Sequence, residues 1–283
     1  MQQSFEVSGP AELDVRLASG EIEVETVEGA TRVEVELIAH DEESQQHVDA
    51  ARIELHDNHG RPQVIVDVPQ RRGSFSLGSF FGRQGITCRL RAPEHSGLSV
   101  RSKSADVRAR GTLGAANIQT ASGDVRLEDV DGGLNIKSAS GDILAQQIGG
   151  AANVQTASGD VSVDAVRGPV NAQTASGDLR IGEAWDNVNA STVSGDQMHG
   201  AVLRGTVAAH SVSGDVVIGV RRGSKVFLDC NTVSGDTRSE LELTTEAPAG
   251  DGPLVEIRAK TVSGDIAITR APAPADNAQE VHA

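Results

Sequence analysis

The stretch TASGDV at residues 120–125 returns seven more times along the chain with only small changes. The serines of the first five copies lie 18 residues apart, and the later spacings are 19, 21 and 29 residues. These serines are Ser122, Ser140, Ser158, Ser176, Ser194, Ser213, Ser234 and Ser263. Degenerate copies, SADV at 104–107 and ASGEIEV at 18–24, extend the pattern towards the N-terminus. A fixed repeat period is typical of solenoids, in which each unit stacks on its neighbours.

Apolar and polar residues alternate on both sides of each Ser-Gly-Asp. Around Ser140, for example, Leu134 and Ile136 precede the motif, and Ile143 and Ala145 follow it. Alternation with a period of two indicates strands with one buried face. We therefore predict an all-β fold, a parallel β-solenoid or β-helix of about 18-residue, two-strand coils. Each strand should lie parallel to its copy in the next coil.

The Ser-Gly-Asp motif falls where the chain must reverse between these two strands. Glycine reaches a positive φ at no steric cost, and Asp and Ser side chains hydrogen-bond the backbone of their own turn. These properties favour a role in folding.

The alternative is a ladder of cations, because stacking would bring one carboxylate per coil into a row. The candidate ligands are Asp124, Asp142, Asp160, Asp178, Asp196 and Asp215. Ca²⁺ prefers six to eight oxygen ligands, which one Asp per coil does not supply. The sequence therefore assigns no metal and no cofactor.

Two further rows repeat with the same period and are read as structural. Asparagines lie five residues before each of the first five serines, at Asn117, Asn135, Asn153, Asn171 and Asn189. Hydroxyl residues lie two residues before it and are predicted to point inward, at Thr120, Ser138, Thr156, Thr174 and Thr192.

Composition narrows the possible functions. Only 2% of the residues are aromatic, with one Trp and no Tyr, so the core must be thin and built from aliphatic side chains. The net charge of −15 argues against nucleic acid as a partner, since such binding needs a basic surface. Cys88 and Cys230 do not form a disulfide framework. Cys230 falls at an inward position, where we expect a buried free thiol.

Targeting signals are not evident in the sequence. The first residues lack the basic stretch and apolar run of a signal peptide. No segment reaches the roughly 18 apolar residues that a membrane span needs. We therefore expect no integral membrane span and a cytoplasmic location.

The two ends of the chain differ from its middle. Residues 1–100 keep the alternation but lose the period, so we expect a β-rich N-terminal cap with the first coils. Residues 101–270 form the repeat solenoid, and residues 271–283 are rich in Pro and Ala, as in a flexible tail. Within 41–55, Val48, Ala51 and Leu55 have helical spacing and indicate a short helix or a turn leading into a strand.

One loop, QRRGSFSLGSFFGRQG at 70–85, concentrates aromatic and basic residues in an acidic, aromatic-poor chain. It is a disordered loop, a cap folding back on the first coil, or an exposed contact site. As a contact site it would bind a protein partner or a membrane surface through phenylalanine anchors and an arginine rim. The residues concerned are Arg71, Arg72, Phe75, Phe80, Phe81 and Arg83.

Catalytic motifs are missing from the sequence. It holds no nucleotide-binding loop, no nucleophile elbow and no Cys/His spacing for a metal. The stretch HDNH at 56–59 brings two histidines near a carboxylate, which we read as a surface coincidence. The aromatic platforms of sugar-processing β-helices are also missing. We predict that the protein is not an enzyme.

The repeat Gly-x-[LV]-[NAV]-x-x-[TS]-[AV]-Ser-Gly-Asp-[VIL], with its Gly-rich second turn, resembles the bacterial putative-adhesin β-strand-repeat family, also called the toastrack domain. The resemblance covers roughly residues 5–270. It implies a stack of parallel strands and non-enzymatic roles, often tied to envelope-stress systems of the phage-shock and Lia type. Family members often carry a membrane helix or signal that this sequence does not show, which favours an intracellular scaffold.

The leading hypothesis is a non-enzymatic, adhesin-like interaction scaffold in envelope-stress homeostasis. It would bind an unidentified, membrane-associated or other protein partner through its long faces or the 70–85 loop. One alternative is a bactofilin-like structural polymer, which needs uncapped ends. Another is an exported adhesin or glycan-binding module.

Overall fold

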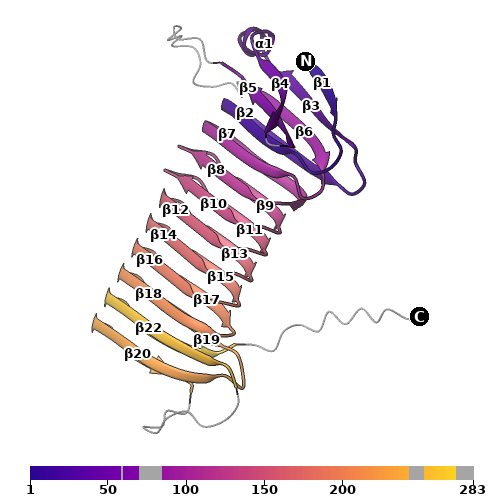
Figure 1. Ribbon diagram of the computed structural model, residues 1–283. Coiled ribbons are helices and arrows are strands. Elements are labelled where there is room, and N and C mark those ends of the chain that lie inside the picture. The colour runs from indigo at the N-terminus through magenta and orange to yellow at the C-terminus, as the bar shows by residue number, and fades with distance from the viewer. Residues whose placement is uncertain (59, 70–84, 242–251, 272–283) are drawn as a thin grey trace, which may run out of the picture.

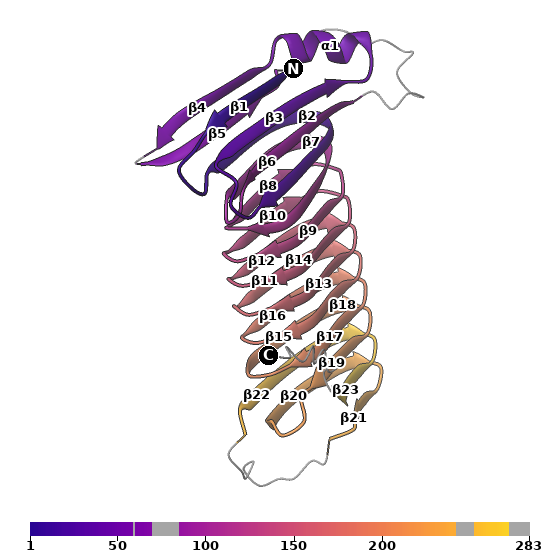
Figure 2. The same ribbon diagram turned by 90° about the vertical axis from the view of Figure 1, so that its right-hand side faces the viewer.

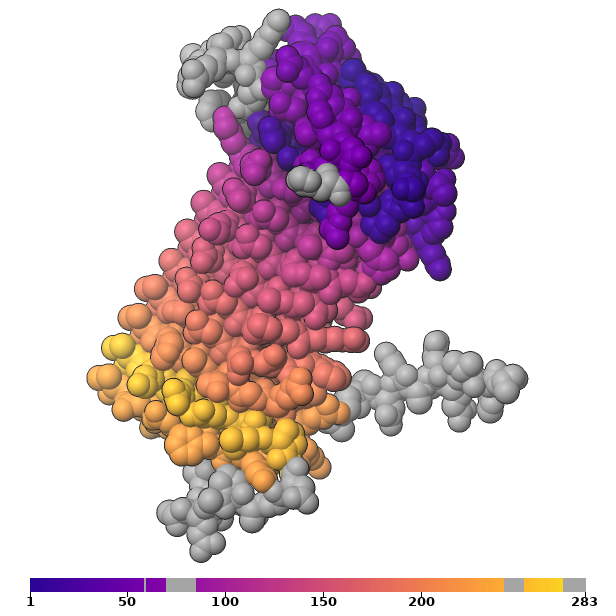
Figure 3. Space-filling view, viewed as in Figure 1, coloured from indigo at the N-terminus to yellow at the C-terminus, as the bar shows by residue number. Residues whose placement is uncertain are grey.

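A computed structural model of the chain describes residues 1–58, 60–69, 85–241 and 252–271. The strands stack coil upon coil into one rod, and antiparallel strands and a short helix gather at its N-terminal end (Figures 1 and 2). The space-filling view shows a continuous rod that broadens over the N-terminal strands (Figure 3). The single helix among the described residues is too short to cross a membrane.

Each regular repeat forms two strands, one on each side of its Ser-Gly-Asp turn. The strands before the turn are β8 (Ala116–Thr120), β10 (Leu134–Ser138), β12 (Ala152–Ser158), β14 (Val170–Ser176), β16 (Val188–Ser194) and β18 (Gly205–Ser213). Those after it are β9 (Val125–Val130), β11 (Ile143–Ile148), β13 (Val161–Val166), β15 (Leu179–Ala184), β17 (Gln197–Val202) and β19 (Val216–Val220). Every strand pairs in parallel with its copy in the next coil, as Leu134 does with Ala152. The predicted parallel solenoid is confirmed.

The strands before the turns form one sheet of the rod, and the strands after the turns form the other. The core lies between these two sheets and is made of small aliphatic side chains. Ile118, Ile136 and Val154 stack at equivalent positions and are almost completely buried. The threonine row also points inward, as predicted, with Thr156 and Thr174 buried. The Thr156 hydroxyl donates to the Ser158 carbonyl at 3.0 Å. The row thus satisfies its own polar atoms inside an apolar core.

The first coils are built from longer strands. In β7 (Gly97–Leu113) the degenerate SADV lacks the turn glycine, and the strand runs through both halves of the coil. It pairs in parallel with β2 (Glu12–Val27), which pairs on its other side with β5 (Arg61–Asp67) and β6 (Ile86–Pro93). The strand β2 therefore lies between strands that follow it in the chain.

Antiparallel strands close the N-terminal end. They are β1 (Gln2–Glu6), β3 (Arg32–Ala39) and β4 (Arg52–Asn58), with β3 between β1 and β6, and β4 against β5. The helix α1 (Glu42–Asp49) begins after Asp41, whose side chain accepts from the Ser44 N–H at 2.7 Å, and it buries Val48.

The helical spacing seen in the sequence over 41–55 holds only for part of that stretch. The helix ends at Asp49, and Leu55 belongs to β4, where its side chain is exposed. Of the two alternatives, the helix holds for 42–49, and Leu55 lies on the strand that follows it. The reason is tertiary: β4 pairs along its whole length with β5, which overrides a weak helical pattern.

The last two coils are stacked in the reverse of their sequence order. The strands β22 (Leu254–Ser263) and β23 (Ile266–Arg270) pair with β18 and β19 on one side. On the other side they pair with β20 (Lys225–Ser234) and β21 (Thr237–Ser239). Figure 1 shows β22 between β18 and β20. The expectation that each coil follows its predecessor is wrong here.

The polarity of the inward residues explains why the last two coils stack in reverse order. The inward residues of β22 and β23, such as Ile257 and Ile266, are fully buried and aliphatic, whereas β21 directs Thr237 and Ser239 towards the core side. Placing the more apolar coil between two neighbours buries more apolar surface. As a consequence Cys230 of the outermost coil is only half-buried, which corrects the expected buried thiol.

Candidate functional site

The aspartates of the repeat form a row of hydrogen bonds along the rod. The backbone N–H of Asp142 donates to Oδ1 of Asp124 at 3.1 Å, and the same bond recurs from coil to coil at 2.8–3.1 Å. In spatial order the row is Asp106, Asp124, Asp142, Asp160, Asp178, Asp196, Asp215, Asp265 and Asp236. One carboxylate oxygen of each aspartate, except that of the outermost Asp236, thus holds the turn of the next coil.

The glycine of each motif is required by the same stacking. Gly159 has a φ of 121°, and a Cβ there would overlap the carbonyl oxygen of Gly141 in the neighbouring coil. Only glycine combines this backbone conformation with so close an approach. The turn geometry therefore supports the role in folding.

A cation role for the aspartate row remains a prediction. Its second carboxylate oxygen is used in some coils, as at Asp124, which binds Arg126 at 2.9 Å. Within the described ranges no group of three His, Cys, Asp or Glu residues is placed to hold a metal ion. In HDNH, His56 binds Glu54 at 3.0 Å, and His59 lies outside the described residues.

The phenylalanine and arginine contact site predicted from the sequence lies outside the described residues. This applies to Arg71, Arg72, Phe75, Phe80, Phe81 and Arg83. Its role stays a prediction, as does that of the C-terminal tail beyond Ala271.

A continuous row of exposed valines runs beside the Ser-Gly-Asp turns of the last four coils. It consists, in spatial order, of Val193, Val212, Val262 and Val233, with exposed fractions of 54%, 50%, 50% and 79%. We call this row the valine ridge. The registers place its members side by side, because Ser194 pairs with Ser213, Ser213 with Ser263, and Ser263 with Ser234. In the earlier coils the same position holds exposed alanines, at Ala121, Ala139, Ala157 and Ala175.

The valine ridge has carboxylates beside it. Asp196, Asp215 and Asp236 follow its members by three residues and are exposed. Since Oδ1 of Asp196 and Asp215 accepts a backbone bond, the second carboxylate oxygen of each can face a partner. The surface therefore combines an apolar centre with an acidic margin, and its sequence signal is the change from TASGD to TVSGD.

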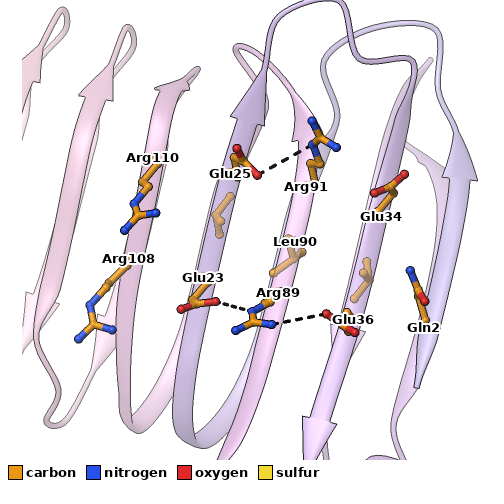
Figure 4. A pocket seen from close by; sticks show the side chains of 12 residues that line it. Gln2, Glu23, Glu25, Glu34, Glu36, Arg89, Leu90, Arg91, Arg108 and Arg110 are labelled. Atoms are coloured by element: carbon orange, nitrogen blue, oxygen red, sulfur yellow. Dashed lines mark hydrogen bonds and ion pairs between the residues drawn. The ribbon is translucent and has the colours of Figure 1, made fainter.

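A charged hollow of about 340 Å³ lies on the N-terminal strands. Figure 4 shows arginines of β6 and β7 alternating with glutamates of β2 and β3 across it. Arg89 Nε donates to Glu23 Oε2 at 2.6 Å and lies 3.9 Å from Glu36, while Arg91 lies 3.9 Å from Glu25. The hydrogen bond and charge of Glu23 raise the pKa of the Arg89 guanidinium.

The charges in this hollow largely neutralise one another. Opposite charges on adjacent strands favour one register, and such exposed pairs add little to stability because solvent screens them. We therefore give the hollow a structural role in aligning the cap strands. The sequence carries a signal for it, because the outward residues of each strand share one sign, as in EIEVE at 21–25 and RLR at 89–91.

One coil carries polar groups in the core. Gln197 and His199 occupy inward positions of β17 that are aliphatic in most coils, and both are buried. Gln197 Nε2 donates to Thr192 Oγ1 at 3.0 Å and to the His210 carbonyl at 2.6 Å. His199 Nδ1 and Ser211 Oγ find no hydrogen-bond partner among the described residues. Burial lowers the pKa of His199 to about 4, so the imidazole is neutral.

Comparison with known proteins gives a family. Residues 6–191 match the family model described as Toastrack DUF4097. No curated protein matches the chain.

Solved structures with a similar course of the chain include a putative adhesin from Bacteroides fragilis. Its TM-score is 0.47 and its identity 13%, over 95% of this chain and 96% of its own. A putative adhesin from Parabacteroides distasonis has a TM-score of 0.43 and 12% identity, over 94% and 96%. A putative lipid binding protein from the same species has a TM-score of 0.38 and 13% identity, over 94% and 96%.

Proposed function

The chain belongs to the toastrack family, and we propose that it is a non-enzymatic interaction scaffold that binds a protein partner along the valine ridge. The observation that carries the proposal is the continuous exposed apolar row over four coils. Isolated exposed apolar residues are ordinary on protein surfaces, whereas a contiguous row marks an interaction site. A rigid rod holds such a row straight and at a constant spacing.

The chemistry of the described residues supports a binding role over a catalytic one. The two groups with the most strongly shifted pKa values, Cys88 and His199, are buried in the core. Burial raises the pKa of the Cys88 thiol to about 12, which keeps it protonated and unreactive. A substrate outside the rod would reach neither group.

The margin of the valine ridge indicates what the partner presents. Its carboxylates and the net charge of −15 favour a segment with an apolar stripe and basic residues beside it. An extended or helical peptide of a membrane-associated protein has this character when it follows a basic juxtamembrane stretch.

The finer proposal places this scaffold in the cytoplasm and in envelope-stress homeostasis. Cell fractionation distinguishes this scaffold from an exported adhesin or glycan-binding module. Recovery of the native protein in the cytosolic fraction supports the scaffold, and recovery at the cell surface would replace it with the exported module.

The binding proposal is tested by changing the last four repeats into the form of the earlier ones. The substitutions are Val193→Ala, Val212→Ala, Val262→Ala and Val233→Ala. Because alanine already occupies this exposed position in four other coils, the variant should keep its melting temperature. A matched control, Leu144→Ala with Met198→Ala, removes exposed apolar side chains from the other sheet.

The measurement is cross-linked affinity capture from a bacterial membrane and cytosol extract, quantified by mass spectrometry. We expect one protein retained by the wild type and the control, and reduced about tenfold or more with the ridge variant, as for loss of interface anchors. Equal retention of that protein by the ridge variant would refute the proposed site.

A further inference from the structure

The two ends of the rod differ in how their strand edges are treated. At the N-terminal end, antiparallel strands and α1 cover the core, and the outer strand β4 carries charged residues such as Arg52, Glu54 and Asp57. Charged residues of this kind protect an edge from pairing. At the other end the outermost coil is β20 with β21, and no strand among the described residues pairs with its outer side.

The outer coil leaves apolar side chains half-covered. Val226, Leu228 and Cys230 of β20 point towards the core but are only partly buried. Their counterparts one strand inward, Ile257 and Ala259, are fully buried. On the outward face Phe227 is 53% exposed. The core of the rod is therefore open at this end within the described residues.

The backbone of β20 is oriented for further pairing. The N–H of Lys225 donates to the Pro253 carbonyl at 2.9 Å, so the odd-numbered residues of β20 bond towards β22. In a parallel ladder successive residues face opposite sides. The N–H and C=O groups of Val226, Leu228 and Cys230 therefore point to the outer edge, where an extended strand of another chain can bond them.

We propose that this edge binds a second copy of the chain, with β20 antiparallel to β20 of the second copy about a two-fold axis. The two β20 strands match in length, whereas β21 has three residues and cannot cover the ten of β20. Among the described residues of the N-terminal end, the outer strands pair antiparallel and offer no matching parallel edge. The contact is therefore isologous and closes at two copies, unlike a head-to-tail contact, which would extend into a filament.

The register follows from charge. An axis through Cys230 overlaps residues 226–234 of the two strands. It places Cys230 opposite Cys230 of the second copy and Phe227 opposite Val233 of the second copy. It also places Asp229 opposite Asn231. Moving the axis one residue towards the N-terminus would instead place Asp229 opposite Asp229 of the second copy. Like charges directly opposite each other are unfavourable.

The second sheet is complementary in the same arrangement. Thr192 bonds Gln197 across the core, so the residue two before a serine faces the one three after it. Continuing this pairing, the residue four before a serine faces the one five after it, so Cys230 faces Ser239. An axis that passes through Cys230 therefore passes near Ser239. Arg238 then lies opposite Glu240 of the second copy, an opposite-charge pair that favours this register.

Sedimentation of the full chain over a range of concentrations tests the proposal. We expect a monomer–dimer equilibrium for the wild type. Phe227→Lys should raise the dimer dissociation constant about tenfold or more, because it places a charge where the edge packs. Leu254→Lys is the matched control: Leu254 is equally exposed, at 55%, but lies one strand inward on β22, so its dimer should persist.

Mild oxidation provides a second readout of the register. Directly opposed residues that exchange hydrogen bonds have Cα atoms about 5.5 Å apart, within the range that a disulfide bridges. We expect a covalent dimer that Cys230→Ser abolishes and Cys88→Ser does not. A monomer at all concentrations, a dimer unaffected by Phe227→Lys, or growth into filaments would each overturn the closed edge-to-edge dimer.

Discussion

The backbone N–H of Asp236 donates a 2.8 Å hydrogen bond to the side chain of Asp265, which lies 29 residues later in the chain. Asp265 in turn donates its N–H to Asp215 at 2.8 Å. The aspartate row thus runs from Asp215 to Asp265 to Asp236. The same turn contact that joins consecutive repeats also joins repeats out of order, so the motif specifies a fit between coils and leaves their order open.

This coil order predicts which engineered disulfides form. Ala208 pairs with Arg258 in neighbouring strands, so the double variant Ala208→Cys, Arg258→Cys should cross-link readily in a Cys230→Ser background. Ala208 and Asp229 are two strands apart, about 9.6 Å, and their cysteine pair should stay reduced. Non-reducing peptide mapping distinguishes the pairs. The opposite pattern would show that the coils stack in the order of the sequence.

The turn glycines should be intolerant of a side chain. We expect Gly159→Ala to lower the free energy of unfolding by at least about 2 kcal/mol, because of its positive φ and the overlap with Gly141. Gly133→Ala is the control, since its Cβ would meet only the Ala151 carbonyl at 3.6 Å. Urea unfolding of both variants measures the difference, and equal losses would contradict the account of the turn.

The aspartates should act as hydrogen-bond acceptors. Asp160→Asn keeps an oxygen for the N–H of Asp178, so its stability should stay within about 0.5 kcal/mol of the wild type. Asp160→Ala removes the acceptor and should cost about 1 kcal/mol. Chemical denaturation at neutral pH compares the two. Were the asparagine variant as unstable as the alanine one, the charge and not the hydrogen bond would matter.

Buried His199 should make the protein sensitive to acid. Its pKa is lowered to about 4 from an ordinary 6.5, so between these values the unfolded chain binds a proton that the folded chain does not. Stability should therefore fall as the pH drops from 6.5 to 4, by about 3 kcal/mol in all. Above pH 6.5 the imidazole is neutral in both the folded and the unfolded chain, so none of this stability is lost.

The variant His199→Leu isolates this effect. It replaces the imidazole, whose Nδ1 has no partner among the described residues, with an apolar side chain of similar size. We expect a higher melting temperature and the loss of that part of the acid sensitivity, measured by thermal unfolding from pH 4 to 7. A pH profile identical to that of the wild type would show that other groups cause the sensitivity.

Local sequence could predict the coil but not the complete stack. The inward places of Ile136 and Val154 follow from alternation, because one face of each strand must be buried. The position of Ser263 between Ser213 and Ser234 does not follow, because every repeat offers the same edge and the same turn. Only the polar Thr237 and Ser239 hint that their coil belongs at the end.

The candidate surfaces, too, could be predicted only in part from the local sequence. The valine ridge is visible in the change from TASGD to TVSGD, but its continuity depends on the coil order that brings Val262 beside Val212. The charged hollow depends on β2 and β6 meeting across 66 residues, at Glu23 and Arg89. Such non-local pairings leave only a weak mark in the sequence, here the single sign of charge on each strand.

The repeated Ser-Gly-Asp directs folding, and thermal unfolding in EDTA and in millimolar Ca²⁺ tests this role. We predict the same melting temperature in both, because Oδ1 of each inner aspartate already accepts a backbone N–H. A rise of several degrees with Ca²⁺ would contradict the claim and show that the row binds cations.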